Sequence, residues 1–563
     1  MDTKKSFSKY VIGLDFGTDS VRALIVDVEN GREIATHVSN YKRWSSGKYQ
    51  DPAKNMFRHH PLDYIEAMQD VIIQSIKQAP EGLAQNIIGI GVDTTGSTPA
   101  PVDIEGTVLS LKEEFSENPN AMFILWKDHT AVKEADLINK TAKSWGGTDF
   151  TQYCGGIYSS EWFFSKILHI LRNDLQVKEN SYSWVELADW IPAILTGNIN
   201  PLKMKRSRCA AGHKAMWHSQ WEGLPPEEFL IKIDPLLSGL RSRLYSKTYT
   251  SDAAAGTLTK EWADKLGLNP GVTVTVGAFD PHMGAVGGQI SEGIFVKVLG
   301  TSCCDMAVGP KSIDENLIDG ICGQVDGSII PGMIGYEAGQ SSFGDVYAWF
   351  KDVLCWPLAA ILPDLDFVVK ETADLIASAI RDKIIKKIEE VAQDISPQET
   401  GLIALDWLNG RRTPYADQKL KGAIAGLSLG STAPKIYRAL VEATAFGSRA
   451  IVERFRQDGL KINEVVAIGG IPKKSPLVMQ ILADVLGMPV KVAESSQTVA
   501  LGAAIFGAVA AGYYDDIYKA QEKMASKFLM TYYPEKTRVK LYNSIYKLYI
   551  EFGNITEDLL RKL

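Results

Sequence analysis

One pattern in the sequence constrains the fold more than any other. It consists of an apolar run, a polar turn that contains glycine, and a second apolar run. It occurs twice, first from Val11 to Asp27 and again from Gly293 to Val308. Two apolar runs joined by such a turn are typical of a β-hairpin. Because the copies lie about half a chain apart, we expect each hairpin to begin its own domain.

Strand-like runs and helical patterns alternate after each hairpin. Residues 61–78 have a helical pattern and precede a strand-like run at 87–93. After the second hairpin, the pattern predicts a helix at 433–457, a strand at 464–468, a turn at Gly469-Gly470, a helix at 475–486 and a strand at 490–492. This alternation is typical of α/β layers, so the sequence predicts an α/β protein with two such layers.

The chain divides into three expected ranges. Gly287-Gly288-Gln289 interrupts the pattern and places the first boundary near residues 288–292. We expect an N-terminal domain at 1–290, a C-terminal domain at 291–520 with a charged helical insertion at about 358–400, and a helical tail at 521–563. The Ala- and Gly-rich run 501–512 is shorter than the ~18 residues that cross a bilayer, and it predicts a buried helix.

Composition narrows the class of partner. The chain has 60 Lys and Arg against 67 Asp and Glu, a net charge of −7, and 45% of its residues are hydrophobic. That composition excludes a disordered or collagen-like chain. Nucleic acids and anionic membranes require clustered Lys and Arg, which the sequence lacks. We therefore expect small-molecule chemistry, with no nucleic-acid and no membrane partner.

The N-terminus and the cysteines indicate the compartment. The first ten residues lack the apolar core of a signal peptide. The six cysteines include no Cys-x-x-Cys pair, so neither a zinc site nor a disulfide framework is indicated. Both observations favour a cytoplasmic protein with reduced thiols.

The turns of the two hairpins carry the first candidate chemistry. Gly17 lets backbone N–H groups approach an anion, and the neighbouring hydroxyls can donate hydrogen bonds, so this turn can hold a phosphate. Asp15 beside a phosphate makes sense if a cation such as Mg²⁺ separates the two charges. The alternative is a polar turn in which an Asp caps its own backbone. A second turn of this kind at 300–302 strengthens the phosphate hypothesis, because two such turns can bind one polyphosphate from two sides.

Asp280 ends a strand-like run just before a glycine-rich helix. Strand ends are where open α/β sheets place their chemistry, so Asp280 is a candidate general base, with a helix N-cap as the alternative. His282 caps, packs or takes part in catalysis, and the sequence leaves these readings open.

Several familiar nucleotide and hydrolase motifs are absent. The sequence has no G-x-x-x-x-G-K-[ST] loop and no G-x-G-x-x-G after a strand. Gly426 to Gly430 matches G-x-S-x-G, but the α/β-hydrolase order requires a later histidine and His282 is the last in the chain. P-loop, dinucleotide, protein-kinase and hydrolase mechanisms are therefore not expected.

Taken in order, Leu14 to Thr18, Ala278 to Asp280, Leu299 to Ser302 and Ile468 to Gly470 resemble the FGGY carbohydrate kinases. The resemblance covers about residues 10–515. It implies two ribonuclease-H-like domains of the actin, hexokinase and Hsp70 ATPase type, flanking an ATP- and sugar-binding cleft.

Three stretches resemble the members of that family that phosphorylate L-ribulose: Asp93 to Pro99, Cys209 to Lys214 and Phe279 to Gly287. The expected reaction is ATP-dependent formation of L-ribulose 5-phosphate, as in arabinose catabolism. A kinase for another polyol or ketopentose, such as xylulose or D-ribulose, stays open, as does a chaperone- or filament-type ATPase of the same fold. The resemblance also leaves a homodimer open.

The resemblance assigns roles to individual residues. It makes Asp280 the base and Asp15 a magnesium ligand through water. Contacts to the phosphates of ATP are implied for Gly17, Thr18, Arg22, Gly300, Thr301 and Ser302. The adenine and ribose would lie at Gly469 and Gly470, although Lys473-Lys474 follows where many members have a smaller polar residue, which leaves the adenine contacts open.

The sugar pocket implied by the resemblance has four residues, namely Gly96, Lys214, Asp280 and Glu337. Glu337 would accept hydrogen bonds from vicinal hydroxyls, or it is the N-terminal carboxylate of a helix. Lys214 follows a run too apolar for an open face, which argues against a solvated surface charge. Trp126 stacks on the apolar face of the sugar or belongs to the core.

Overall fold

The computed structural model describes residues 8–311 and 317–563. Most of the N-terminal segment discussed above, residues 1–7, lies outside the described residues. The contacts divide the chain into two compact units. The first unit comprises Met1–Ser291, Met306–Tyr336 and Gln497–Lys527, and the second comprises Glu292–Asp305, Glu337–Ser496 and Phe528–Leu563.

These units differ from the contiguous ranges 1–290, 291–520 and 521–563, because the helix predicted at 501–512 returns to the first unit. This helix, α17 (Thr498–Ala510), contacts β1 (Tyr10–Phe16) and β6 (Ile87–Thr94). The approach is so close that a Cβ on Gly13 would lie 1.8 Å from the carbonyl oxygen of Ala500. A local pattern identifies such a helix, but it does not reveal which distant sheet the helix packs on.

The first sheet has the order β10-β11-β6-β1-β2-β3, with a short strand, β12, that also pairs with β6. β1 is antiparallel to β2, as the hairpin pattern predicts, and parallel to β6. The remaining strands are β2 (Ser20–Asp27), β3 (Glu33–Asn40), β10 (Ala254–Thr257), β11 (Thr273–Thr275) and β12 (Ala278–Phe279).

The second sheet has the order β15-β16-β14-β13-β19-β20-β21. Its run β16-β14-β13-β19-β20 repeats the run β3-β2-β1-β6-β11 of the first sheet, so the repeated hairpin of the sequence begins a repeated sheet. The strands are β13 (Gly293–Leu299), β14 (Cys303–Pro310), β15 (Gly323–Asp326), β16 (Met333–Gln340), β19 (Ile462–Gly469), β20 (Val490–Ala493) and β21 (Phe528–Tyr532). β21 is a strand within the tail that was expected to be helical, and it pairs antiparallel with β20.

Short strands form three further pairs or small sheets. They are β4 (Gln50–Asp51) and β5 (Met56–His59) with β8 (Phe123–Ile124), β7 (Pro99–Val102) with β9 (Ser183–Glu186), and β17 (Ile403–Leu405) with β18 (Ala423–Ala425).

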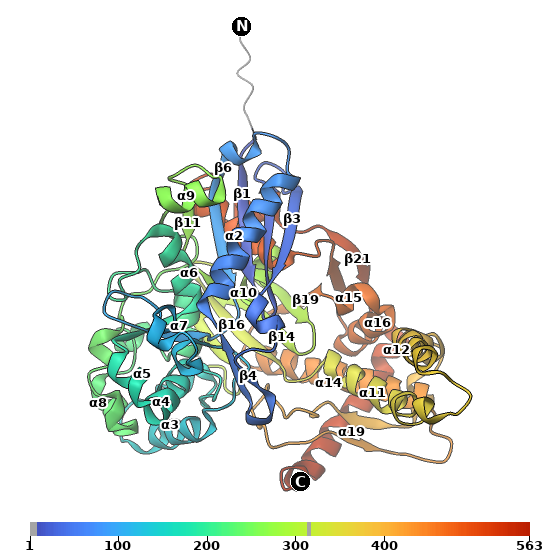
Figure 1. Cartoon of the computed structure of the whole chain (residues 1–563). Coiled ribbons are helices and arrows are strands. Elements are labelled where there is room, and N and C mark those ends of the chain that lie inside the picture. Colours follow the sequence, from blue (N-terminus) through green and yellow to red (C-terminus); the bar gives the residue numbers. More distant parts are fainter. Residues whose placement is uncertain (1–7, 312–316) are drawn as a thin grey trace. The chain divides into compact units, whose positions relative to one another are not determined.

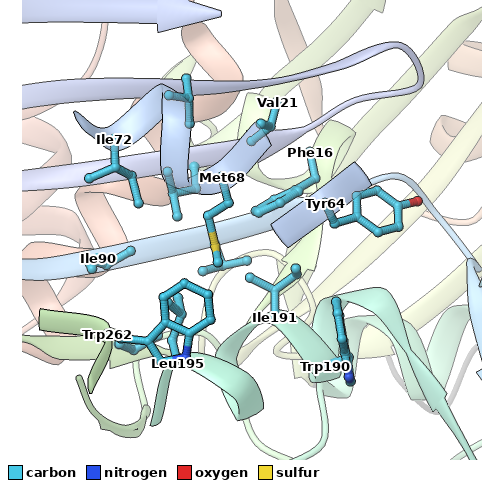
Figure 2. Packing of buried hydrophobic residues seen from close by; sticks show 14 of the residues in the cluster. Phe16, Val21, Tyr64, Met68, Ile72, Ile90, Trp190, Ile191, Leu195 and Trp262 are labelled. Atoms are coloured by element: carbon cyan, nitrogen blue, oxygen red, sulfur yellow. The ribbon is translucent and has the colours of Figure 1, made fainter. Parts of the chain in front are cut away.

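The core of the first unit lies between its sheet and the helices around it. Helix α2 (Pro61–Gln78) contacts β2 and β3 (Figure 1). Tyr64, Met68 and Ile72 recur on one face of α2, the spacing of an amphipathic helix, and all are fully buried. Figure 2 shows them in one cluster with side chains of β1, β6, α6 (Leu187–Thr196) and α9 (Lys260–Leu266).

The other helices of the first unit are α1 (Lys42–Ser45), α3 (Val132–Ser144), α4 (Phe163–Asn173), α5 (Leu175–Asn180), α7 (Arg208–Lys214), α8 (Glu227–Ile233), α10 (Asp280–Gly287) and α18 (Ile517–Met524). A second apolar cluster lies among these helices, including α3, α4, α7 and α8.

In the second unit, α14 (Ala433–Gln457) matches the helix predicted at 433–457. The helix α16 (Pro476–Leu486) begins after Ser475, whose hydroxyl accepts the N–H of Val478, and ends at Gly487 in the left-handed conformation. The others are α11 (Gly344–Ala360), α12 (Lys370–Ala392) in the predicted insertion, α13 (Pro397–Thr400), α15 (Ile471–Lys474) and α19 (Lys536–Leu560). Within the described ranges, no helix combines the length and apolar character needed to span a membrane.

Candidate functional site

Three carboxyl groups gather at one edge of the first sheet. Asp15 near the end of β1 lies opposite Asp93 near the end of β6 in the parallel register. On the other side of β6, Ala278 of β12 lies opposite Asp93, and Asp280 follows as the first residue of α10. Because the carboxyl ends of parallel strands meet at one edge, three separate segments of the sequence deliver their carboxylates to one place.

The charges at this edge are unbalanced. Burial, together with the neighbouring Asp15 and Asp280, raises the pKa of Asp93 well above its ordinary value. One guanidinium offsets them, since Nη1 of Arg22 lies 2.8 Å from Oδ2 of Asp15 and this pairing raises the pKa of Arg22. A set of oxygen donors with this surplus of negative charge fits a hard divalent cation such as Mg²⁺.

The turn of the first hairpin is held by backbone hydrogen bonds. The N–H of Gly17 donates to the carbonyl of Ser20 at 3.0 Å, and the N–H of Thr95 donates to the carbonyl of Phe16 at 3.0 Å. A Cβ on Gly17 would come to 3.2 Å from Nη1 of Arg22, the same atom that Asp15 holds at 2.8 Å. Glycine at this position therefore leaves room for the guanidinium beside the turn.

Two indole rings fix the tip of this turn. Nε1 of Trp44 donates to Oδ1 of Asp19 at 2.7 Å, and Nε1 of Trp126 donates to Oγ1 of Thr18 at 3.0 Å. Trp126, expected at the sugar, thus also supports a residue expected at the phosphates. The ring is partly buried and packs against the core cluster of the first unit, which agrees with the core alternative. Stacking on the sugar stays a prediction.

The first unit also brings together the predicted sugar residues Gly96, Lys214 and Asp280. A Cβ on Gly96 would come no closer than 3.8 Å to the ring of Phe279, the residue before Asp280, so protein packing does not require glycine there. Lys214 is the last residue of α7, which contacts β12. Its side chain is buried and its Nζ lies 5.0 Å from the centroid of Trp162, so the solvated surface charge is excluded.

The structure also places His282 and Glu337. His282 is buried on α10, and the centroid of its ring lies 4.6 Å from that of His213. Glu337 belongs to the second unit and lies on β16, so the alternative that it begins a helix is wrong.

The second turn is braced against the start of α11 within the second unit. The N–H groups of Phe343 and Asp345 donate to the carbonyl of Thr301, and the N–H of Gly344 donates to the carbonyl of Gly300, at 2.9 to 3.1 Å. These bonds orient the carbonyls toward the helix, while Gly300 and Thr301 stay exposed. Such a turn leaves its outer side accessible to an anion, as the phosphate hypothesis requires.

An ion pair lies buried on the strands that flank this turn. Nζ of Lys297 on β13 lies 2.6 Å from Oδ1 of Asp305 on β14, and both side chains are fully buried. The thiol of Cys303 donates to the same oxygen at 3.0 Å. The pair links the two strands close to residues 300–302 and so fixes the base of the hairpin.

The two predicted adenosine glycines differ in what requires them. Gly469 ends β19 with a φ of +99°, and a Cβ there would lie 2.5 Å from the carbonyl oxygen of Leu299. Gly470 has nothing within 4 Å of such an atom. Lys473, which left the adenine contacts open, donates from Nζ to the carbonyl of Glu494 at 2.6 Å and to Oγ of Ser496 at 2.8 Å.

Sequence reasoning did not single out three buried groups: Asp93, Lys166 and Glu186. Asp93 stands within a quoted motif and near the end of a strand, so the rule applied to Asp280 could have found it. Lys166 lies on the apolar face of α4 among Phe163, Ile167 and Ile170. A lysine on such a face could have indicated a buried charge with a specific role. No pattern in the sequence pointed to Glu186.

Two family models match the two halves of the chain. Residues 10–287 match the model of the N-terminal domain of the FGGY family of carbohydrate kinases, and residues 295–511 match the model of its C-terminal domain.

Two curated relatives cover almost the whole chain. A ribulokinase of Vibrio parahaemolyticus is 51% identical over 561 residues, covering 99% of this chain and 98% of the relative. A ribulokinase of Halalkalibacterium halodurans is 39% identical over 578 residues, covering 99% and 97%.

Solved structures share the fold at much lower identity. The xylulose kinase of Rhodospirillum rubrum is 19% identical with a TM-score of 0.78, covering 98% of this chain and 100% of that one. The glycerol kinase of Plasmodium falciparum, solved with ADP, is 16% identical with a TM-score of 0.72, covering 97% and 98%.

Proposed function

Because this chain belongs to the FGGY family of carbohydrate kinases, we propose that it transfers the γ-phosphoryl group of ATP to the 5-hydroxyl of L-ribulose. The observation that carries the chemistry is the gathering of Asp15, Asp93 and Asp280 at one sheet edge. The choice of sugar is supported by the two ribulokinases that match along 99% of the chain.

Asp280 is the proposed general base. It follows a strand end and lies at the start of α10, next to Phe279, the residue nearest Gly96. A carboxylate there can accept the proton of the attacking hydroxyl as the bond to phosphorus forms. Phosphoryl transfer passes through a loose transition state, so the main work of the protein is to align the two reactants.

The two turns are the proposed phosphate contacts. In the first, Gly17 leaves the backbone without a side chain, Thr18 offers a hydroxyl, and Arg22 offers a guanidinium already oriented by Asp15. In the second, the carbonyls of Gly300 and Thr301 are turned toward the start of α11, whereas the carbonyl of Ser302 accepts the N–H of Gly300. Donors fixed before the reaction stabilise negative charge on the phosphoryl oxygens at little reorganisation cost.

Asp15, through water, would hold a Mg²⁺ ion, which when bound supplies positive charge against the phosphate oxygens. Gly469 and Gly470 are proposed to admit the adenosine.

Gly96, Lys214, Glu337 and Trp126 are the proposed sugar contacts. Gly96 leaves space beside Phe279. The buried ammonium of Lys214 is a donor for a carbonyl or hydroxyl, and the carboxylate of Glu337 is an acceptor. A site built on such pairs rejects sugars that lack the matching groups, because its polar atoms would then stay unpaired.

We propose that the reaction takes place in the cytoplasm, where ATP is available, and that range 1–290 supplies most of the sugar contacts while range 291–520 supplies the adenosine contacts. A homodimer is a further proposal, which sedimentation velocity of the full chain tests directly.

The second candidate function is a polyol-independent ATPase of the chaperone or filament type. The burial of Lys214 beside Trp162, and the open space at Gly96, favour a small polar ligand instead. ADP release with and without each sugar of a ketopentose and polyol panel tests the proposal. A rate that rises several-fold with a ketopentose supports the kinase, and a rate unaffected by every sugar supports the ATPase.

A further inference from the structure

Lys166 is a fully buried lysine of α4 that contacts two separate parts of the proposed sugar site. Its Nζ donates to the carbonyl of Ser97 at 2.6 Å, next to Gly96. It also donates to the carbonyls of Leu125 at 2.9 Å and Ile124 at 3.3 Å, just before Trp126. One side chain therefore joins the loop of Gly96 to the segment of Trp126.

Glu186, on β9, holds the same loop from another direction. Its carboxylate accepts the hydroxyl of Ser97 at 3.0 Å and the N–H of Thr98 at 2.7 Å. Ser97 has a φ of +31°, in the region that residues other than glycine rarely adopt. A residue keeps such a conformation only where its surroundings determine it strongly, and here both Lys166 and Glu186 contact it.

The hydrogen bonds indicate the charged form of this pair. An ammonium group has three N–H donors and a neutral amine has two, so three carbonyl acceptors match the protonated lysine. The two hydrogen bonds that Glu186 accepts match a carboxylate. Both groups are buried and attract each other electrostatically. Removing either one therefore leaves the other charge less compensated.

We propose that Lys166 is a positioning residue for the sugar site: together with Glu186, its ammonium holds the Gly96 loop and the Trp126 segment at a fixed spacing. The inference deepens the proposed function and rests on it. Lys166 acts through the backbone of these segments, so it is not a catalytic residue. Removing its charge should weaken sugar binding more than ATP binding.

The first test is Lys166→Met, which keeps an unbranched side chain one atom shorter and removes the three donors. We expect KM for L-ribulose to rise about tenfold or more, the scale of misplaced binding groups, while KM for ATP changes less than about threefold. Glu186→Gln keeps an acceptor for the N–H of Thr98 and should give a smaller change in the same direction. If both variants fold and neither changes KM for the sugar, the proposal is wrong.

Arg438→Met is the matched control. Arg438 is a buried cation of α14 in the second unit, paired with the buried Glu442 at 2.9 Å. Its loss should lower thermal stability without a selective rise in KM for the sugar. If Arg438→Met raises KM for L-ribulose as much as Lys166→Met does, the effect is one of general stability and the positioning role is refuted.

A pH profile adds a readout that general destabilisation would not move. Burial lowers the pKa of Lys166 to about 7 and raises the pKa of Glu186 to about 7, so the two groups titrate together. Glu186 and Glu161 act to raise the pKa of Lys166, whereas Arg58 and Lys214 act to lower it. As pH rises above 7, the amine loses one donor, so KM for the sugar should rise in the parent enzyme. The rise should be absent in Lys166→Met, and an unchanged rise in that variant would contradict the proposal.

Hydrogen exchange separates this inference from the proposed function, because it needs no substrate. In the sugar-free full chain, peptides covering residues 94–98 and 124–126 should exchange faster in Lys166→Met than in the parent or in Arg438→Met. Unchanged exchange in both peptides would refute the positioning role even if the parent phosphorylates L-ribulose. Faster exchange in a protein with no activity on any sugar would instead refute the function and leave the positioning role supported.

Discussion

Nε1 of Trp126 donates a hydrogen bond to the hydroxyl of Thr18 over 3.0 Å. The bond joins a side chain proposed to contact the sugar to the turn proposed to contact ATP, and both residues belong to the first unit. The sequence separates them by more than a hundred residues, so only the fold reveals the link. Through this bond, a change at one residue should affect the other.

Trp126→Phe keeps an aromatic ring and removes the donor, and Thr18→Val removes the acceptor. We expect each change to raise KM for ATP a few-fold, because the tip of the turn loses a support. In a double-mutant cycle, the two effects should couple by about 0.5–1.5 kcal/mol, the usual net worth of one hydrogen bond. Strict additivity of the two changes would show that the bond does not influence ATP binding.

Asp280→Asn should lower kcat by on the order of 10²–10⁴, the usual loss when a general base is removed. The fold should survive, since the change removes a charge and little volume. Asp136→Asn, an exposed change on α3, serves as the control and should leave kcat unchanged. Turnover of Asp280→Asn within a few-fold of the parent, with ATP affinity equal to the parent's, would exclude Asp280 as the base.

Gly300→Val tests the second turn. A Cβ at this position would come no closer than 3.8 Å to any neighbouring atom, so the folded protein has room for it. We expect an unchanged melting temperature and a KM for ATP raised at least tenfold, because a side chain would occupy the space proposed for phosphate. Gly430→Val is the matched exposed control, with 3.7 Å of clearance. Unaltered ATP kinetics in Gly300→Val would remove this turn from the nucleotide site.

Gly469 and Gly470, at the end of β19, should differ in how much each contributes to stability. Gly469 has a positive φ and close contact with Leu299, so Gly469→Ala should destabilise the protein by roughly 1–3 kcal/mol. Gly470 has neither constraint, so Gly470→Ala should leave stability within about 0.5 kcal/mol. Chemical denaturation of the two variants measures the difference, and equal stabilities would contradict the contact at Gly469.

The sequence predicted the parts of this protein whose signal is local. The two hairpins, the helix at 433–457 and the strand end before Asp280 follow from periodicity and turn residues, and the structure confirms each. The roles of Asp15, Gly96, Lys214 and the phosphate glycines stay predictions.

The parts that could not be predicted depend on distant contacts. The return of α17 to the first unit depends on glycines such as Gly13, which let the helix pack closely against the sheet. The sequence near residue 500 does not indicate that β1 is its neighbour. The strand β21 forms because β20 offers it an edge. Lys166 donates to three carbonyls on two other segments of the chain. A pattern along the sequence does not reveal such distant contacts.

The identity of the sugar and of the phosphorylated position can be measured directly. The experiment determines kcat/KM of the purified full chain with saturating MgATP for L-ribulose, D-ribulose, xylulose and glycerol, and locates the phosphate in the product by NMR. We expect L-ribulose to give the highest value and to yield the 5-phosphate. Glycerol preferred over every ketopentose, or phosphate on another carbon of L-ribulose, would contradict the proposed function.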